Sequence, residues 1–377
     1  MRKNFVLCVL VLLCFSTRLT AEVIFPFVMP NARTAAIGGG HAALSDDFYS
    51  LFSNPASFLE TDGKFNAVEL TVSTFGPVFE IVDLLIAHAE SWDDLDLSPI
   101  IGANGFAAGM DFGGPVSIGW VGKGLGLGMF TRMKSDATVS GLQLRPIVSA
   151  ELLLVGGYSF RIIEKDSHIL DAGFLGKGFL RTKLDFSSSI LTAEKMFDHM
   201  WERPFTTILG LGFDLGLKYT FAKTFSAALV CFDAYTPVMV TTYASMEGFK
   251  NKDAPMEPGH YATVKPRLDL GFKYRLRSTF LDKYISNINI LFDYHDFLDL
   301  GSVLPRNPML NIGLGAEIVV LEKLSLRIGI ADSLPAAGFG LDLSFMQLDC
   351  SIHGKELGLD PGIFSVYAVD FALHFRH

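Results

Sequence analysis

The stretch that decides the fold is LNIGLGAEIVVLEKLSLRIGI, residues 310–330. In its first half every second residue is apolar: Leu310, Ile312, Leu314, Ala316, Ile318 and Val320. Such period-two alternation is typical of a strand with one apolar face. After the short charged link Glu322-Lys323 the alternation resumes at Leu324, Leu326, Ile328 and Ile330. The stretch therefore predicts a β-hairpin.

The same rhythm recurs from Phe65 to the C-terminus, in segments of roughly ten residues separated by Gly, Pro, Asp and Asn. The last segment, from Tyr367 to Phe375, alternates most cleanly. We predict about fourteen strands, within a range of 12 to 16, at residues 65–75, 104–112, 115–122, 124–134, 146–163, 168–186, 206–221, 224–236, 265–277, 285–297, 310–320, 324–330, 338–352 and 367–375.

This strand count contains a conflict. Counted back from the C-terminus, it puts the long stretch from Thr241 to Val264 on the periplasmic side, where the turns of membrane barrels are usually short. Either a strand is miscounted near Val238 to Tyr243, or the barrel breaks the loop rule.

Composition favours a membrane barrel. The chain is 50% hydrophobic and its mean hydropathy is +0.36, yet after Phe15 it has no apolar run of the roughly 18 residues that a membrane helix needs. Charged residues make up 19%, and the 36 glycines and 33 phenylalanines are abundant. An apolar lipid face with aromatic girdles has this composition. We therefore expect an all-β, transmembrane antiparallel barrel over residues 65–377, in a bacterial outer membrane.

The N-terminus reads as a secretory signal peptide. Arg2 and Lys3 precede an apolar run from Phe5 to Phe15, which is too short to cross a bilayer as a helix. We predict that residues 1–21 are removed by cleavage after Ala21. A lipoprotein acylated at Cys14 is the alternative, but the bulky Leu13 precedes that cysteine where a small residue is expected.

Cleavage would change the charge and the cysteine content. Removing Arg2, Lys3 and Arg18 takes the net charge from −9 to −12, which argues against nucleic acid as a partner. Cys231 and Cys350 would remain. They could pair, but two buried free thiols are the simpler expectation.

Three segments do not read as strands. Residues 22–64 precede the first convincing strand, and we predict that they form an N-terminal hatch or plug in the lumen. Residues 79–90 and 191–201 carry apolar residues at helical spacing, typical of loop helices. The second supplies a candidate apolar mouth for a ligand: Met196, Phe197, Met200 and Trp201. Packing on the barrel rim is the simpler explanation of that spacing.

The sequence offers little catalytic chemistry. Gly122, Gly124, Gly126 and Gly128 recur every second residue, so they suit close packing on one strand face rather than a dinucleotide site. Ser351, His353 and Asp349 share a strand face, which leaves a hydrolase geometrically possible. The acidic clusters around Asp293 and Asp198 lack the spacing of a calcium or zinc site. We expect no enzyme, no cofactor and no metal.

The N-terminal segment carries a family resemblance. Residues 31–47, NARTAAIGGGHAALSDD, and residues 52–58, FSNPASF, resemble the hatch of FadL/TodX-type barrels, where a Gly-rich segment leads to an Asp-Asp pair and an Asn-Pro-Ala motif. PorV-like relatives, which serve protein secretion, share this pattern. The likeness covers about 30 residues and is diffuse elsewhere.

The resemblance implies a fourteen-stranded barrel, filled by its hatch, for passive uptake of hydrophobic compounds such as long-chain fatty acids. It assigns gating of the ligand to Gly38, Gly39, Gly40, Asp46, Asp47, Asn54, Pro55 and Ala56. These residues could equally hold the plug without touching ligand. The implied partners are hydrophobic small molecules, outer-membrane lipid and the barrel-assembly machinery.

The chain departs from the family in two places. The terminal aromatic residue is Phe375, followed by Arg376 and His377, so the assembly signal is slightly displaced. A basic residue for a fatty-acid carboxylate is not evident, although Arg132, Arg145, Arg181 and Arg203 are candidates. The alternative function is a PorV-like protein-binding platform in secretion or surface attachment, with an apolar groove at the rim and no through-path.

Overall fold

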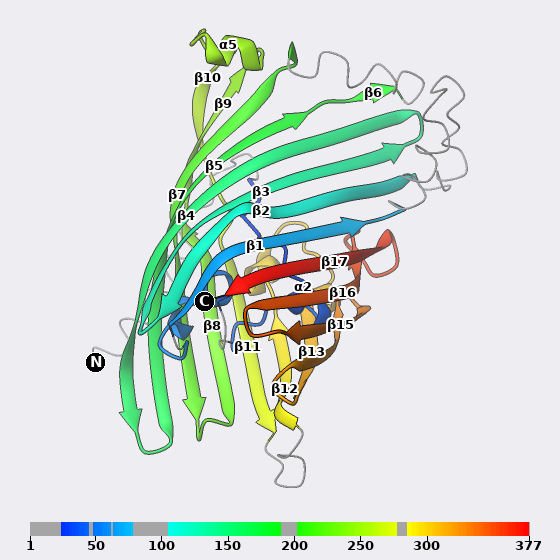
Figure 1. The fold of residues 1–377 in the computed structure, drawn as a ribbon. Coiled ribbons are helices and arrows are strands. Elements are labelled where there is room, and N and C mark those ends of the chain that lie inside the picture. Colours follow the sequence, from blue (N-terminus) through cyan, green and yellow to red (C-terminus); the bar gives the residue numbers. More distant parts are fainter. Residues whose placement is uncertain are drawn as a thin grey trace.

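The computed structural model describes residues 24–44, 48–61, 63–77, 105–189, 202–276 and 285–376. These residues form one antiparallel sheet, which closes on itself where β1 (Lys64–Phe75) pairs with β17 (Ser365–Arg376) (Figure 1). The strands between them are β2 (Phe106–Gly122), β3 (Leu125–Ser140), β4 (Gln143–Lys165), β5 (His168–Asp185), β6 (Ser188–Ser189), β7 (Phe205–Phe221), β8 (Phe225–Tyr235), β9 (Pro237–Tyr243), β10 (Glu257–Thr263), β11 (Arg267–Leu276), β12 (Ile285–Tyr294), β13 (Ile312–Val320), β14 (Leu324–Ala331), β15 (Leu334–Asp342) and β16 (Met346–Glu356).

The ring has fourteen strands, because three of them are interrupted. β6 continues β5 along β4, β9 continues β8 along β7, and β10 and β11 together pair with β9 and β8. The predicted barrel of fourteen strands is confirmed. The count rested on two errors that cancelled. The strands predicted at 104–112 and 115–122 both fall on the single strand β2, which begins at Phe106, whereas the strand predicted at 338–352 spans parts of both β15 and β16.

The second error explains the conflict over residues 241–264. Once β15 and β16 are counted separately, the link 244–256, with its short helix α5 (Met246–Lys250), moves to the end of the barrel that carries the links 295–311 and 357–364. We call this end the loop end. The opposite end, which we call the turn end, carries short connections such as 321–323 and 343–345.

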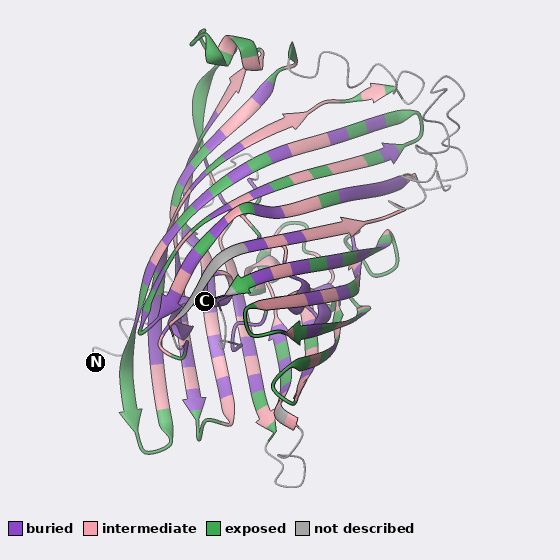
Figure 2. Ribbon diagram, viewed as in Figure 1, coloured by how far each residue is buried: buried purple, intermediate pink, exposed green. Residues whose placement is uncertain are grey.

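The two faces of the wall have opposite chemistry. Exposed and more buried residues alternate along its strands (Figure 2). On β14 the outward Leu326, Ile328 and Ile330 are exposed, while Arg327 between them is 3% exposed. On β13 Glu317 is likewise buried. An outer face of exposed apolar side chains and an inner face that holds the charges is the pattern of barrels that sit in lipid. The chain thus fits a bacterial outer-membrane barrel.

The described parts of the N-terminal segment, residues 24–44 and 48–61, lie within the ring. They contain α2 (Ala32–Ala36), α3 (Ser50–Ser53) and the 3₁₀ turn η1 (Pro55–Ser57). Ile24 bridges to Val264 beside β10, α2 contacts β14 to β17, and η1 contacts β4, β5 and β7. A segment that touches opposite arcs of a closed wall must run through its interior. Among the described residues, no helix is both long and apolar enough to traverse a bilayer.

The interior holds one large apolar cluster, and charged side chains are buried around the ring. Facing β2 to β10 is an apolar cluster: Ile24, Met29, Phe48, Leu51, Phe58, Val121, Phe130, Leu153, Val155, Leu175, Phe179, Ile208, Val238, Val240, Ala262 and Val264. Buried charges on the arc from β11 to β1, which we call the polar wall, include Asp293, Glu317, Arg327, Asp349, Asp370 and Glu69. The arc from β3 to β8 also buries charges, namely Arg132, Glu151, Asp171, Arg181, Asp214, Lys218 and Asp233. Cys231 and Cys350 are both free thiols; Cys231 is buried, and Cys350 is only half-buried, contrary to expectation.

Candidate functional site

The candidate site is the contact between the N-terminal segment and the inner wall, and the Asn54-Pro55-Ala56 motif lies in it. Asn54 has extended backbone angles and caps η1, because its Oδ1 accepts the backbone N–H of Ala56 at 2.9 Å. Its Nδ2 donates to the backbone oxygen of Ala42 at 3.0 Å and to that of Leu217 on β7 at 3.4 Å. The one side chain therefore joins η1, an earlier turn and the wall.

Two wall glycines receive this motif. A methyl group on Gly216 of β7 would lie 2.1 Å from Asn54 Oδ1, and one on Gly173 of β5 would lie 2.4 Å from the carbonyl carbon of Pro55. A third glycine, Gly126 of β3, makes room for the Leu51 and Phe58 side chains. Close packing of bulky groups was predicted at Gly122, Gly124, Gly126 and Gly128, and it is confirmed at Gly126. The prediction that all four share one strand face is wrong, because Gly122 ends β2 and Gly124 lies in the turn before β3.

We expect Asn54→Ala to destabilise the barrel by about 2 kcal/mol, because it removes three hydrogen bonds in a buried setting. The check is urea unfolding of the refolded protein. Asn307→Ala is the matched control: Asn307 also precedes a proline and caps a 3₁₀ turn, η6 (Pro308–Asn311), but its contacts to Met309 and Asp360 are exposed. Equal losses in the two variants would contradict a special role for the buried motif.

The first two glycines of the Gly38-Gly39-Gly40 run lie directly on the opposite wall. Gly38 has a φ of +86°, and a methyl group on it would lie 2.2 Å from the carbonyl oxygen of Leu314 on β13. Gly315 and Gly329 leave the matching space on the wall. Gly39 has a φ of +111°, and a methyl group on it would lie 3.3 Å from His295 Nε2, whereas Gly40 is exposed and has open space around it.

Two histidine–aspartate pairs flank the glycine run. His41 is 1% exposed; its Nδ1 bonds Asp293 on β12, and its Nε2 bonds the backbone oxygen of Ile37 at 2.7 Å. The Asp293 carboxylate also accepts the Ala42 N–H at 2.8 Å. Just past β12, His295 Nδ1 lies 3.0 Å from the Asp269 carboxylate on β11. Asp293 is thus a buried anchor and not a solvated lumen residue.

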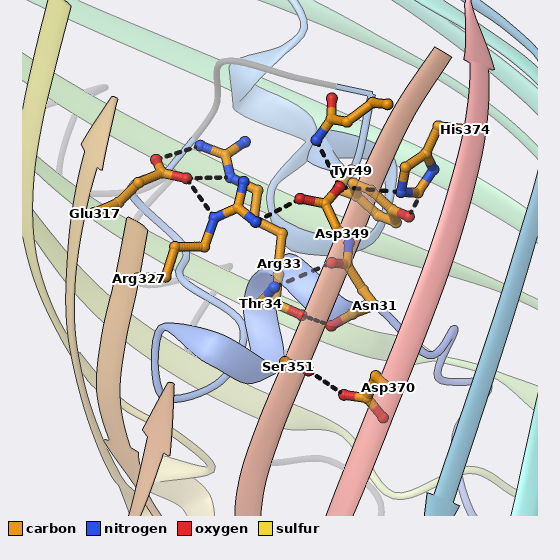
Figure 3. A network of polar contacts seen from close by, with 11 residues as sticks. Asn31, Arg33, Thr34, Tyr49, Glu317, Arg327, Asp349, Ser351, Asp370 and His374 are labelled. Carbon is orange, nitrogen blue, oxygen red and sulfur yellow. Dashed lines mark hydrogen bonds and ion pairs between the residues drawn. The ribbon is translucent and has the colours of Figure 1, made fainter. Parts of the chain in front are cut away.

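A network of charged side chains fastens α2 to the polar wall (Figure 3). Arg33 of α2 donates twice to Glu317, from Nε at 2.9 Å and from Nη2 at 2.7 Å. Arg327 on β14 donates to the same carboxylate at 2.9 Å and also to Asp349 on β16. Asp349 in turn lies 3.3 Å from Nε2 of His374 on β17. One buried carboxylate, Glu317, therefore holds two guanidinium groups.

At the apolar cluster the N-terminal segment meets an irregular part of the wall. Cα pairing of β2 with β3 shifts by two residues between Gly113 and Ser117, and pairing of β2 with β1 lapses at the same level. Gly113 is covered from inside by Met29, whose Cε would lie 2.8 Å from a methyl group on that glycine. The ladder of the wall is thus broken beside the apolar cluster.

Several predicted site residues stay untested. Asp46, Asp47, Met196, Phe197, Met200 and Trp201 lie outside the described residues, as do the signal peptide and the two predicted loop helices. The role of residues 22–64 as a hatch, and the gating role of Gly38 to Gly40 and of Asn54, Pro55 and Ala56, remain predictions.

The candidate arginines for a carboxylate all have partners. Arg132 donates to Asp111 at 2.8 Å, and Arg181 contacts Glu151 at 2.7 Å. Arg145 pairs with Asp185 at 2.8 Å, and the Arg203 guanidinium lies over the ring of Phe186. The structure thus ranks none of the four as a carboxylate receptor.

The possible hydrolase triplet does not assemble. Ser351 Oγ donates to Asp370 at 2.7 Å, and His353 Nδ1 lies 3.3 Å from the same carboxylate oxygen. Asp349, the acid expected from the sequence, instead contacts Arg327 and His374. In a catalytic triad the histidine lies between the nucleophile and the acid. Here the acid lies between the other two, so the serine has no neighbouring base within this triplet.

Sequence reasoning gave no role to Arg33 or Met29. Arg33 is the only cation in the small-residue stretch from Asn31 to Leu44, and Glu317 is the only charge in the strand 312–320. A lone charge in an apolar setting signals a buried pair, so this signal could have identified Arg33 and Glu317, although not Met29. Nothing in the sequence pairs them, because 284 positions separate them.

Comparison with solved structures identifies the fold. The toluene transporter TbuX of Ralstonia pickettii superposes with a TM-score of 0.51 at 15% identity, covering 92% of this chain and 98% of TbuX. The CymD monoaromatic hydrocarbon channel gives 0.49 at 13%, covering 94% and 98%, and a Pseudomonas aeruginosa FadL homologue gives 0.47 at 11%, covering 94% and 99%. No family profile and no curated protein sequence matches the chain. The chain has the closed, fourteen-stranded barrel fold of the FadL/TodX-type transporters.

Proposed function

We propose that this barrel takes up hydrophobic compounds passively across the outer membrane. The observation that carries the proposal is the large apolar cluster inside the barrel, where the N-terminal segment meets β2 to β10. Most membrane barrels have polar interiors, whereas ligand sites for hydrophobic molecules are mostly apolar with a few polar anchors. A compound would bind between the N-terminal segment and this apolar wall.

The broken ladder of β2 supports an exit through the wall. Around Gly114 and Pro115 the strand loses regular pairing to β3, and Met29 covers the break from inside. Displacement of the N-terminal segment would uncover it. A hydrophobic compound could then pass sideways from the apolar cluster into lipid.

The charged side chains near the apolar cluster indicate which kind of ligand it would bind. Arg132 pairs with Asp111 and Glu151, and Arg181 pairs with Glu151. Neither arginine is therefore an isolated cation that could receive the carboxylate of a ligand. Desolvating a carboxylate beside satisfied ion pairs is costly. We therefore propose that neutral hydrocarbons suit this interior better than the long-chain fatty acids that the resemblance implies. TbuX is itself a toluene transporter.

Deleting Pro115 and Val116 tests the exit. The deletion removes the two extra residues and restores continuous pairing with β3, so we expect uptake of radiolabelled oleate or toluene to fall at least about tenfold. That loss corresponds to a barrier about 1.4 kcal/mol higher. Uptake is measured in Gram-negative cells whose own hydrophobic-compound channels have been removed.

The control for this deletion is Val116→Ala, which keeps the bulge and should transport normally. Surface labelling and heat-modifiable gel mobility verify that both barrels are folded. Unchanged uptake by a folded deletion variant would contradict an exit at β2.

A further inference from the structure

The wall of the barrel has two very different heights (Figure 1). β2, β3, β4, β5 and β7, which we call the long wall, have 17, 16, 23, 18 and 17 residues. β12 to β15, which we call the short wall, have 10, 9, 8 and 9. With a rise of about 3.4 Å per residue and a tilt of about 40°, eight residues span about 20 Å, less than the roughly 25 Å apolar band of a membrane barrel.

Apolar side chains continue beyond both ends of the short wall. At the turn end, Leu321 is 61% and Phe345 is 67% exposed. At the loop end lie two links that we call the rim loops, residues 295–311 and 357–364, which are joined by the hydrogen bond from Asn307 N to Leu359 O at 2.8 Å. Their exposed apolar residues are Phe297, Leu300, Val303, Leu304, Met309, Leu357, Leu359 and Ile363.

The charges of the longer rim loop are turned toward the protein. Asp299 contacts Lys265 at 3.1 Å and accepts the backbone N–H of Arg306 at 2.8 Å. The Arg306 guanidinium donates to Asp332 at 2.7 Å and to the backbone oxygen of Glu356 at 2.7 Å. Charged side chains that face inward beneath exposed apolar ones reverse the arrangement of an ordinary solvated loop.

The shorter rim loop satisfies its backbone from within. The Glu356 carboxylate, at the end of β16, accepts the N–H groups of Gly358 at 2.8 Å, Gly362 at 2.9 Å and Phe364 at 2.7 Å. It also accepts the Ser365 hydroxyl at 2.6 Å. Irregular backbone at the depth of a membrane needs such internal partners, because lipid offers none. A water-exposed loop has no such requirement.

We propose that the rim loops are a lipid-contacting surface, and that their apolar side chains complete the membrane band where the short wall is too low. The partner is the acyl region of the outer leaflet. The rim apolar surface adjoins outward residues of the same wall, such as Leu314, Ile328 and Ile330, which already form the lipid face. Continuity with that face favours lipid over a protein partner.

The long wall sets the level of the band. On β3 the exposed apolar row runs from Leu125 to Met133 and then gives way to Ser135. Leu142, at the tip of the β3–β4 turn, lies beyond this row although it is 65% exposed. Leu142 and Leu304, which is 72% exposed, are thus two similarly exposed leucines near the loop end, of which only Leu304 should reach lipid.

Spin labels distinguish the two leucines. In a Cys231→Ala, Cys350→Ala background, nitroxides are placed at Leu304→Cys, Leu142→Cys and, as a lipid-facing reference, Leu326→Cys. The full mature barrel is reconstituted in phospholipid vesicles, and collision of each nitroxide with oxygen and with a water-soluble nickel chelate is measured. We expect the oxygen-to-nickel ratio at Leu304 to match Leu326 and to exceed that at Leu142 several-fold.

Two results would overturn the proposal. A nickel-accessible nitroxide at Leu304, alongside a lipid-facing Leu326, would mean that the rim is bathed in water and suits a protein partner. Low accessibility to both reagents at Leu304 would mean that protein covers it. If the label itself disturbs the loop, Val303→Cys provides a second position with the same expected ratio.

Discussion

Replacing Glu317 with alanine is expected to release the N-terminal segment from the polar wall. The variant leaves Arg33 and Arg327 buried with one carboxylate fewer, and breaking a buried charge network in this way costs about 3–5 kcal/mol. Most of this stability is lost from the contact of α2 with the wall, because Arg327 keeps its contact with Asp349 whereas Arg33 loses its contact with Glu317. Amide hydrogen exchange of residues 31–44 should accelerate about 100-fold or more.

Arg145→Ala is the control for this variant. Its pair with Asp185 is also bidentate, but the arginine side chain is 57% exposed, so the loss should stay below about 1 kcal/mol. If Glu317→Ala left the exchange of residues 31–44 as slow as Arg145→Ala does, the network would not be what holds the segment.

Gly38→Ala is expected to undock the same segment by a steric route. The new methyl group would lie 2.2 Å from the Leu314 oxygen and 2.5 Å from the Ile330 oxygen, and alanine would have to adopt a φ of +86°. The left-handed backbone costs about 1–2 kcal/mol and overpacking about 1–3 more. Exchange of residues 31–44 should again rise by about 100-fold.

The glycine run supplies its own control. Gly40→Ala lies two positions away, where nothing stands within 4 Å, so it should change stability by less than about 0.5 kcal/mol. Equal effects at Gly38 and Gly40 would show that flexibility of the run matters more than the close approach of Gly38 to the wall.

The alternation of apolar residues predicted most strands of the wall correctly. It failed at one turn and at one bulge. The hairpin at 310–330 matched β13 and β14 closely, because a charged turn separates two clean alternations. The turn at 343–345 was missed because Leu343 and Phe345 are apolar, whereas turns are usually recognised by polar residues, Gly or Pro. Both side chains are exposed, which suits contact with lipid. The run Gly113-Gly114-Pro115 resembles a turn in the sequence but forms a bulge within β2, so one strand was predicted as two.

The site was less predictable than the wall. The Asn54 cap could be expected from an Asn-Pro-Ala motif, since its main contact is local. The wall partners of Arg33, His41 and Met29 could not, because these contacts join residues far apart in the chain and depend on how the ring closes. A lone charge in apolar surroundings indicates that a residue such as Arg33 has a buried partner, but it does not indicate which residue that partner is.

The central claim is that the apolar interior binds hydrophobic compounds. It is tested most directly by equilibrium titration of the detergent-refolded mature barrel with a fluorescent long-chain fatty acid, with unlabelled oleate and toluene as competitors. Phe27→Ser and Phe52→Ser, at the edge of the apolar cluster, should weaken binding about tenfold, the equivalent of about 1.4 kcal/mol, whereas the outward Phe339→Ser should not. Saturable, competable binding with this pattern is the result expected. No binding by a demonstrably folded barrel, or equal losses in all three variants, would contradict the claim.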